Sequence, residues 1–270
     1  MTHPYSLAFL TTFDAGPVEA VKISAQAGYD MVGLRFLPAA LGEPDYPIMT
    51  DKAVQREVSA ALSDTGIQLA DIEIARLKPD TNVATFEAFC ALGRNLGARN
   101  ILVAGDDEDH VRLTDTFARF SELAAQYELT ADLEFMPWTG VKTLNEAYEI
   151  VKNSGAENAG VLIDALHFDR SDSTLDDIKA LPAQYIHYAQ LCDGPAQYDP
   201  SDAGLIEIAR GARLLPGEGG IDLSGIIDGL PSKTVLSVEI PHLVRAETES
   251  PLERAIDALA ASKKIGAQIR

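Results

Sequence analysis

The sequence predicts a single (β/α)8 barrel, an α/β fold in which all 270 residues form one domain, 1–270. Strand-like apolar runs alternate with amphipathic, helix-like runs along the whole chain, which is typical of strand-helix units around a parallel sheet. A doubly wound open sheet is the main competing fold, but residues 9–16 lack the glycine-rich phosphate turn expected after its first strand. We therefore expect a closed barrel, with its active site at the C-terminal ends of the strands.

The elements follow one another in a regular order. We expect strands at Ser6–Leu10, Met31–Phe36, Leu69–Ile74, Asn100–Ala104, Ala131–Phe135, Gly160–Asp164, Tyr185–Leu191 and Thr234–Ile240, where apolar runs have strand length. We expect amphipathic helices at Pro17–Ala27, Lys52–Thr65, Val83–Leu96, Val111–Tyr127, Leu144–Ser154, Leu175–Leu181 and Pro251–Ser262. Proline suits the first turn of a helix, where no amide donor is needed. The long connections Leu37–Thr50 and Asp193–Asp222 are expected to carry specificity, and the second includes a helical segment, Ala203–Arg210.

Composition limits the classes of partner. The net charge of −19 repels nucleic acid and anionic membranes, so neither is an expected partner, and an anionic substrate would need a local patch of Arg or Lys. The start of the chain lacks a secretion signal, and no segment approaches the roughly 18 apolar residues of a membrane span. The two cysteines suggest neither a disulfide framework nor a thiolate metal site. We expect a cytoplasmic protein.

Four carboxylate or amide side chains end successive strand-like runs in the second half of the chain. They are Glu134, Asp164, Gln190 and Glu239, at intervals of 30, 26 and 49 residues. These intervals correspond to one or two strand-helix units, so the four side chains are expected to share one end of the barrel. A single residue of this kind often caps the following helix, but four at such spacing favour one divalent metal ion. Their oxygen-rich set suits Mg²⁺ or Mn²⁺ better than Zn²⁺.

The chain also resembles the xylose isomerase-like TIM barrels, which include sugar isomerases, sugar epimerases and 3-dehydroshikimate dehydratases. The resemblance spans nearly the whole chain and is carried by residues 133–137, by residues 164–167, by the Pro-Gly-Glu-Gly turn that follows Arg213, and by residues 239–241. It implies that the four strand-end residues bind the metal, and that His167 and Arg213 contact the substrate. Most members carry His where this chain has Gln190. Bacterial dehydroshikimate dehydratases look similar to this chain in that departure, which favours the dehydratase alternative. Barrels of this kind often pair through surface helices, so a homodimer is expected.

Such a site indicates a chemistry. A divalent ion that holds the carbonyl and neighbouring hydroxyl of a small polyhydroxylated substrate would act as a Lewis acid and stabilise the enediolate formed when a proton leaves the adjacent carbon. Glu134 and Glu239 come from well-separated strands, so they could exchange protons with opposite faces of the substrate. We expect an isomerase or epimerase of carbohydrate metabolism. The alternative is a dehydratase, a lyase of the 3-dehydroshikimate type that uses the same site, with His167 as acid or base.

The sequence allows two other classes of protein. A DNA-repair endonuclease of the same superfamily is disfavoured, because the chain has only five His and is strongly acidic. A non-catalytic metabolite-binding barrel is a further alternative, although no candidate ligand is missing. Weaker signals come from residues near strand ends or in loops: Arg35, Glu73 and Arg76 are expected near the pocket, His187 is expected to be structural and to face the helices, and His110 is expected at a solvated helix start.

Overall fold

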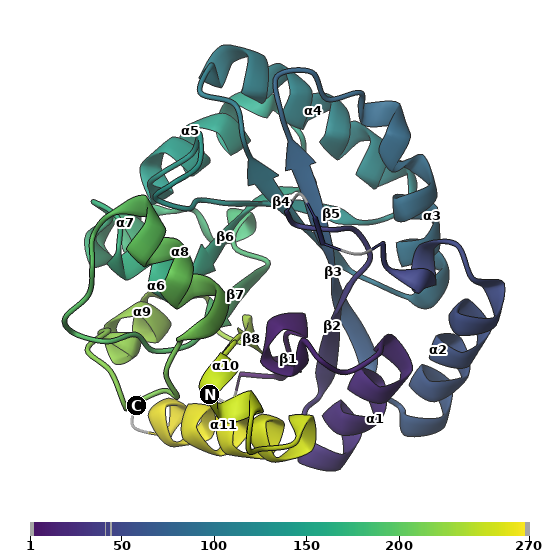
Figure 1. Ribbon diagram of the computed structural model, residues 1–270. Coiled ribbons are helices and arrows are strands. Elements are labelled where there is room, and N and C mark those ends of the chain that lie inside the picture. The colour runs from purple at the N-terminus through teal and green to yellow at the C-terminus, as the bar shows by residue number, and fades with distance from the viewer. Residues whose placement is uncertain (1–2, 41, 44, 268–270) are drawn as a thin grey trace.

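The computed structural model describes residues 3–40, 42–43 and 45–267 and contains a closed barrel of parallel strands that pair in the order β1 to β8 (Figure 1). The predicted (β/α)8 fold is confirmed. The strands are β1 (Tyr5–Leu7), β2 (Met31–Arg35), β3 (Gln68–Leu77), β4 (Asn100–Gly105), β5 (Thr130–Glu134), β6 (Ala159–Asp164), β7 (Tyr188–Leu191) and β8 (Val235–Val238). Since β8 also pairs in parallel with β1, all the carboxyl ends of the strands lie at one end of the barrel.

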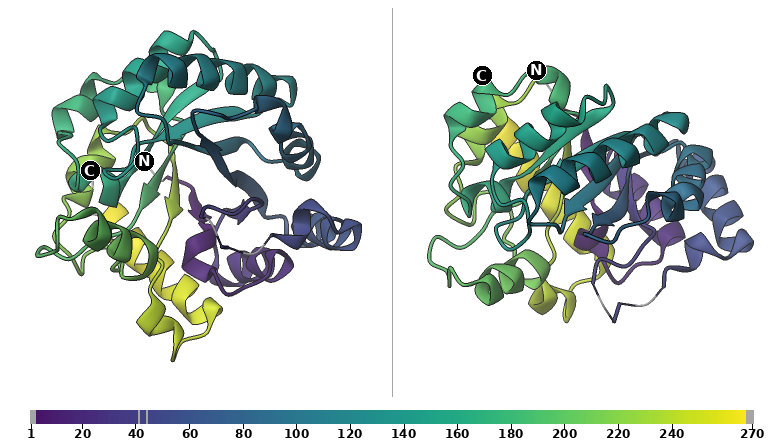
Figure 2. Two further views of the ribbon diagram at one scale, coloured as in Figure 1. Left: turned by 45° about the horizontal axis from the view of Figure 1, so that its top comes forward. Right: turned by 90° about the horizontal axis from the view of Figure 1, so that it is seen from above.

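Helices surround the strands on the outside (Figure 2). They are α1 (Pro17–Ala27), α2 (Lys52–Thr65), α3 (Glu87–Leu96), α4 (His110–Gln126), α5 (Leu144–Ser154), α6 (Ala165–Asp169), α7 (Leu175–Ala180), α8 (Asp202–Gly211), α9 (Leu223–Gly229), α10 (Leu243–Ala246) and α11 (Pro251–Gly266). In the described part of the chain, no helix combines the length and the apolar composition needed to cross a bilayer.

Local signals explain why several helices lie where the sequence predicts them. The helices α1, α2 and α5 have the predicted bounds because each ends at a glycine in the left-handed region, Gly28, Gly66 and Gly155, with φ of 88°, 74° and 68°. Asp51 caps the start of α2 through the amide of Ala53. Capping and termination depend on a few neighbouring residues, so these bounds can be read from sequence.

Strand ends differ more from the expectation. β1 stops at Leu7 because residues 9–12 form a 3-10 helix, η1 (Phe9–Thr12). β7 begins at Tyr188 rather than Tyr185, since η4 (Ala183–Tyr185) occupies the preceding turn. Within the connection Leu37–Thr50, residues 41 and 44 lie outside the described residues, as do both ends of the predicted domain.

Apolar side chains form two buried regions. The larger one lies between the strands and the surrounding helices, and Leu7, Val103, Phe117 and Val161 belong to it. The smaller one includes Ile74, Leu102, Ala104, Met136, Leu162 and Tyr188, all from β3 to β7 or directly after β5. This second cluster fills part of the barrel interior, and three of its members also line the pocket described next.

Candidate functional site

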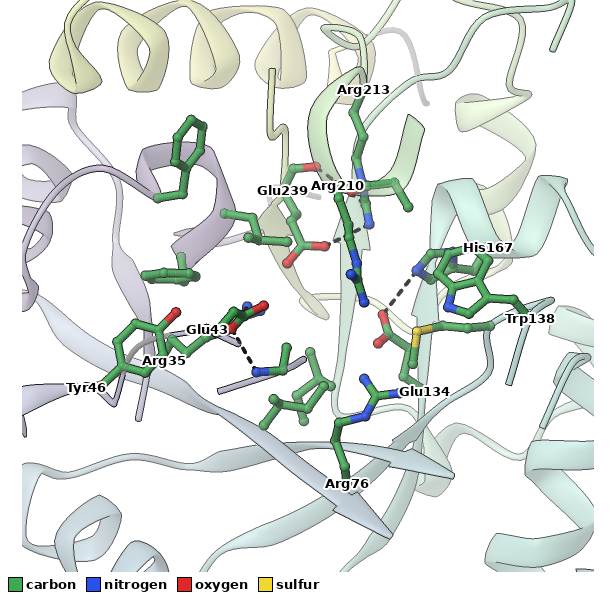
Figure 3. Close-up of a pocket in the computed structure, with 18 of the residues that line it drawn as sticks. Arg35, Glu43, Tyr46, Arg76, Glu134, Trp138, His167, Arg210, Arg213 and Glu239 are labelled. Carbon is green, nitrogen blue, oxygen red and sulfur yellow. Dashed lines mark hydrogen bonds and ion pairs between the residues drawn. The ribbon is translucent and has the colours of Figure 1, made fainter. Parts of the chain in front are cut away.

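A cavity of about 390 Å³ opens at the C-terminal end of the barrel (Figure 3). Its walls are largely apolar and aromatic, with Phe9, Tyr46, Met136 and Trp138 among them. Charged groups from β2, β3, β5 and α8 converge on it, together with Arg213 and with Glu239, which directly follows β8. The volume and the combination of apolar walls with a few polar groups are those of a small-molecule site.

The barrel brings the predicted ligand candidates to this same end. Glu134 and Asp164 are the last residues of β5 and β6, Gln190 lies in β7 opposite Asp164, and Glu239 directly follows β8. None of the four side chains is more than a few per cent exposed. Their convergence follows from the parallel register of neighbouring strands, which puts equivalent strand ends at equal height.

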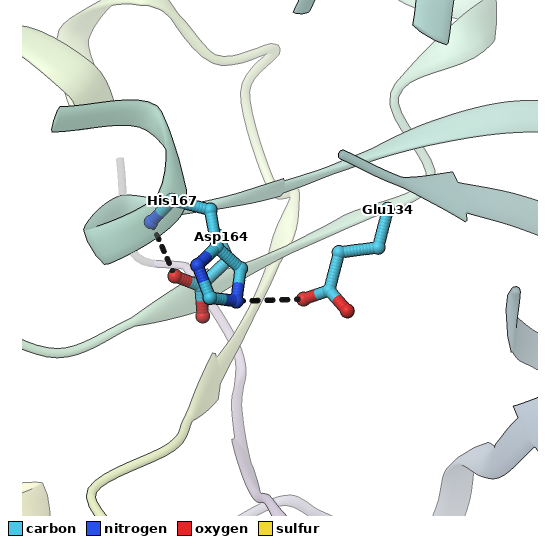
Figure 4. A group of neighbouring side chains, drawn as sticks. All are labelled: Glu134, Asp164 and His167. Carbon is cyan, nitrogen blue, oxygen red and sulfur yellow. Dashed lines mark hydrogen bonds and ion pairs between the residues drawn. The ribbon is translucent and has the colours of Figure 1, made fainter. Parts of the chain in front are cut away.

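Glu134, Asp164 and His167 form a compact group (Figure 4). One potential ligand atom from each lies within 4.8 Å of the others, and Glu134 Oε1 is 3.7 Å from His167 Nε2. Asp164 also caps α6, because its Oδ1 accepts a hydrogen bond from the His167 amide at 3.0 Å. This short helix is what places the imidazole beside the two carboxylates. The His167 ring packs edge-on against Trp138, with ring centroids 5.0 Å apart.

Arg213 joins two of the candidate ligands. Its Nη1 donates to Asp164 Oδ2 at 2.5 Å, and its Nη2 is 3.0 Å from Glu239 Oε2. The arginine is 2% exposed, so this bridge lies in a region of low dielectric, where an unpaired charge is costly. The two carboxylates therefore share one cation supplied by the chain itself.

Gln190 has an unsatisfied acceptor. Its Nε2 donates to Glu239 Oε1 at 3.0 Å, which leaves its Oε1 directed elsewhere. That oxygen is buried and has no hydrogen-bond partner among the described residues. A buried carbonyl oxygen without a donor is unfavourable unless another electropositive group binds it. The amide thus has the free lone pairs that a metal ligand needs.

Burial and crowding of the carboxylates affect their protonation. Burial, reinforced by Asp164 and Glu239, raises the pKa of Glu134 well above its usual value. Burial raises the pKa of Glu239 to about 8, although Arg213 opposes this. Burial would also raise the pKa of Asp164, but the Arg213 guanidinium outweighs it and the net change is downward. Burial lowers the pKa of His167 to about 4, so its ring is neutral near pH 7. A further cation would stabilise all three carboxylates in their ionised form.

The long connection after β7 is organised by Asp193. Its carboxylate accepts hydrogen bonds from the amides of Gly217, Gly219 and Ile221 at 2.9 to 3.1 Å. Its backbone pairs with Leu214. These contacts fold the Pro-Gly-Glu-Gly turn back against the end of β7, and they fix the chain beside Arg213. The sequence analysis did not identify Asp193 as a structural residue.

Weaker signals in the sequence placed Arg35, Glu73 and Arg76 near the pocket. Arg35 and Arg76 line the pocket, and each is paired: Arg35 Nη2 with Glu73 at 2.6 Å, and Arg76 with Asp106 through two 2.6 Å hydrogen bonds. Glu73 itself is fully buried beneath Arg35.

Two more of the five histidines, His110 and His187, hold structural contacts. His110 begins α4, as expected, and its Nε2 is 2.7 Å from the Gly140 carbonyl. His187 lies before β7 begins, and its Nδ1 is 2.6 Å from Asp132 Oδ1, so this residue pairs with a strand carboxylate. His187 was expected to face the helices because it was assigned to the strand. Since β7 begins only at Tyr188, that reason does not hold.

Arg210 and Trp138 are pocket residues that the sequence analysis missed. Arg210 was noticed only as the end of a helical segment. The single available signal was its place in the long connection at the active face.

Comparison with known proteins agrees with this architecture. The family model described as "Xylose isomerase-like TIM barrel" matches residues 21–264. Inosose isomerase of Bacillus subtilis is 27% identical over 148 residues, which are 52% of this chain and 51% of that protein. 3-Dehydroshikimate dehydratase of Pseudomonas aeruginosa is 29% identical over 116 residues, which are 43% of this chain and 18% of that protein. The chain thus aligns with about half the length of one relative and less of the other.

A solved structure shows the same fold. The crystal structure of IOLI protein with a binding zinc atom superimposes with a TM-score of 0.82 at 18% identity, covering 99% of both chains. At this identity the likeness concerns the fold.

Proposed function

The chain belongs to the xylose isomerase-like TIM barrel family, and from this premise we propose that it is a divalent-metal-dependent enzyme of the sugar isomerase or epimerase type. The reaction would remove a proton from the carbon next to a carbonyl of a small polyhydroxylated substrate. The observation that carries the proposal is the convergence of buried Glu134, Asp164 and Glu239 with Gln190, whose Oε1 has no partner among the described residues.

The oxygen atoms of the donor set suit one divalent ion, although Arg213 pairs with two of its members, Asp164 and Glu239, in the structure. Glu134, Asp164, Gln190 and Glu239 would hold it, and their oxygen atoms favour Mg²⁺ or Mn²⁺ over Zn²⁺. His167 lies close enough to Glu134 and Asp164 to add a nitrogen ligand, which would move the preference toward zinc. Such an ion would supply Lewis acidity, withdrawing electrons from the substrate carbonyl.

The protein's own groups would handle the proton. Glu134 ends β5 and Glu239 follows β8, so their carboxylates reach the pocket from strands that are not neighbours in the barrel. One can remove a proton while the other returns it to the opposite face, as epimerisation requires. Arg213 restrains Glu239 through the 3.0 Å contact, and His167 offers a neutral imidazole at the edge of the cavity.

Dehydration of a 3-dehydroshikimate-like substrate is the second candidate. It is favoured by the relative of that activity in Pseudomonas aeruginosa. The first step would be the same proton removal, and a hydroxyl β to the carbonyl would then leave as water once it is protonated, with His167 as an acid or base in the proton transfers. The two candidates differ only in the fate of the intermediate.

Solvent-deuterium incorporation tests the shared first step. The protein is freed of metal with a chelator, then assayed with an inosose and a panel of ketoses in D₂O, with and without Mn²⁺ or Mg²⁺. 3-Dehydroshikimate is assayed in parallel by ultraviolet absorbance, where an aromatic product band would identify the dehydratase. We expect metal-dependent exchange or dehydration with at least one substrate.

Two variants accompany this assay. Glu239→Gln removes a proposed proton carrier and should lower turnover by at least about 100-fold, the scale of a lost general base. Glu207→Gln makes the same change on the exposed side of α8 and should leave turnover unchanged. Full activity in Glu239→Gln would refute the proposed mechanism for both reactions.

A further inference from the structure

Arginine is unusually abundant in the pocket of this acidic protein. Although the net charge is −19, Arg35, Arg76, Arg210 and Arg213 all line the cavity. Arg35 and Arg213 are buried and held by Glu73 in the first case and by Asp164 and Glu239 in the second. These two serve the internal charge balance of the site, which leaves Arg76 and Arg210 to be explained.

Arg210 has no hydrogen-bond or ion-pair partner within residues 3–40, 42–43 and 45–267. It is exposed at the last turn of α8, one turn before Arg213. Figure 3 shows its side chain extending into the cavity, with the guanidinium group directed toward the region of Glu134. An exposed arginine that served only solubility would be expected to extend away from the protein, so this orientation points to a bound group.

Arg76 has donor capacity left. Its Nε and Nη2 bind Asp106 in a bidentate pair that fixes the plane of the guanidinium, and no partner in the described chain binds Nη1. Its side chain is 20% exposed and extends into the cavity from β3 (Figure 3). A guanidinium held in this way is preorganised, so a ligand that binds it loses little side-chain entropy.

We propose that Arg210 and Arg76 form an anion subsite, and that the substrate carries a carboxylate in addition to its reacting carbonyl and hydroxyl groups. This proposal rests on the proposed function for the location of the reacting carbon. A neutral polyol would offer the Arg210 donors only hydroxyl oxygens, which accept weaker hydrogen bonds from a guanidinium than a carboxylate does. The free fork of Arg210 matches the two oxygens of a carboxylate, and Arg76 adds one further donor. The negative field of the protein would otherwise repel such a substrate.

The subsite gives the substrate a defined orientation. The carboxylate would lie between Arg210 of α8 and Arg76 of β3, close to Glu134, and the polyhydroxylated part would extend from there toward Glu239. A substrate of this class is a cyclic or linear hydroxy-keto acid, which favours the dehydratase candidate over a neutral inosose. A phosphate would use the same donors, and the experiment separates the two anions.

Equilibrium binding of matched probes tests the subsite without turnover. Titration calorimetry with Mn²⁺-loaded protein would compare shikimate, its uncharged methyl ester and glucose 6-phosphate. We expect shikimate to bind at least about tenfold more tightly than the ester, the scale of one charge-assisted hydrogen-bonded pair. Equal affinity for acid and ester would overturn the proposal, and tighter binding of the phosphate would overturn the assignment to a carboxylate.

Substitutions of single arginines test which residue produces the preference for the acid over the ester. Arg210→Gln should reduce the preference for the acid to less than about threefold, and Arg210→Lys should keep part of it, since a lysine retains the charge but loses the fork. Arg56→Gln removes an equal charge from an exposed position of α2 and should leave the preference intact. An unchanged preference in Arg210→Gln, or an equal loss in Arg56→Gln, would refute the subsite.

The two proposals can fail separately. If the protein prefers the acid but shows no metal-dependent exchange or dehydration, the anion subsite stands and the proposed reaction is wrong. If exchange occurs with neutral ketoses while acid and ester bind equally, the reaction stands and the subsite is wrong.

Discussion

Replacement of Arg213 by methionine should make the stability of the protein depend on metal. The arginine is 2% exposed and holds Asp164 and Glu239 at 2.5 and 3.0 Å. Methionine is long enough to fill much of the space of the arginine stem, so the main effect is electrostatic. Without the guanidinium, two buried carboxylates lose the cation that contacts both of them.

The size of the effect follows from this geometry. Breaking a buried ion pair by removing one partner costs about 3–5 kcal/mol. For a domain near this size, each kcal/mol lowers Tm by roughly 2–4 °C, so the variant in chelator should melt about 6–20 °C below the wild type. A divalent ion would replace the lost cation, and at 100 times its Kd it would add about 2.7 kcal/mol through binding to the folded state.

The assay is thermal unfolding followed by circular dichroism, in chelator and at increasing Mn²⁺. Metal should raise the Tm of Arg213→Met more than that of the wild type, because the variant has the larger unbalanced negative charge. Arg254→Met is the matched control, since Arg254 is 3% exposed, is held by Asp14 and the Glu249 carbonyl, and neither lines the pocket nor pairs with a candidate ligand.

Two results would refute this reasoning. The first is an Arg213→Met protein that melts within about 2 °C of the wild type in chelator, which would mean that the two carboxylates do not need a cation. The second is an equal metal-induced rise in Tm for Arg213→Met and Arg254→Met, which would separate the arginine from any metal site.

Three further predictions concern other parts of the structure. Gly140→Ala should destabilise the protein by about 1–3 kcal/mol in denaturant unfolding, because a Cβ there would lie 2.6 Å from the Asp107 carbonyl carbon, and an unchanged midpoint would contradict this. Burial alone would lower the pKa of His187, but Asp132 outweighs it and holds the pKa above the ordinary 6.5. The stability that this pair contributes is therefore complete below about pH 6.5 and is lost as pH rises through the folded-state pKa of His187. Between about pH 6 and 9, the Tm should fall more in the wild type than in His187→Gln. Parallel curves of Tm against pH would exclude this linkage. Gln190→His should raise the ratio of bound zinc to bound manganese after dialysis against both metals, since imidazole favours zinc, and an unaltered ratio would argue against Gln190 as a ligand.

Much of the site could be predicted because the end of a strand can be recognised from a few neighbouring residues, and a parallel barrel places all such strand ends together. Glu134 and Asp164 each follow an apolar run, and any parallel barrel places such positions at one end. The same logic explains why Glu239 and Gln190 were identified. Their metal-binding and catalytic roles remain predictions that the experiments above test.

The sequence by itself determined the alternation of strands and helices, several helix bounds and the end of the barrel at which polar residues meet. These depend on periodicity, caps and glycine at left-handed positions, all of which act over a few residues. Only the tertiary structure decided which charges pair. Arg213 bridges residues 49 and 26 positions away, and Asp193 fixes the connection beside it through amides 24 to 28 residues further along. Such contacts form only after the strands have closed, so no local pattern in the sequence records them.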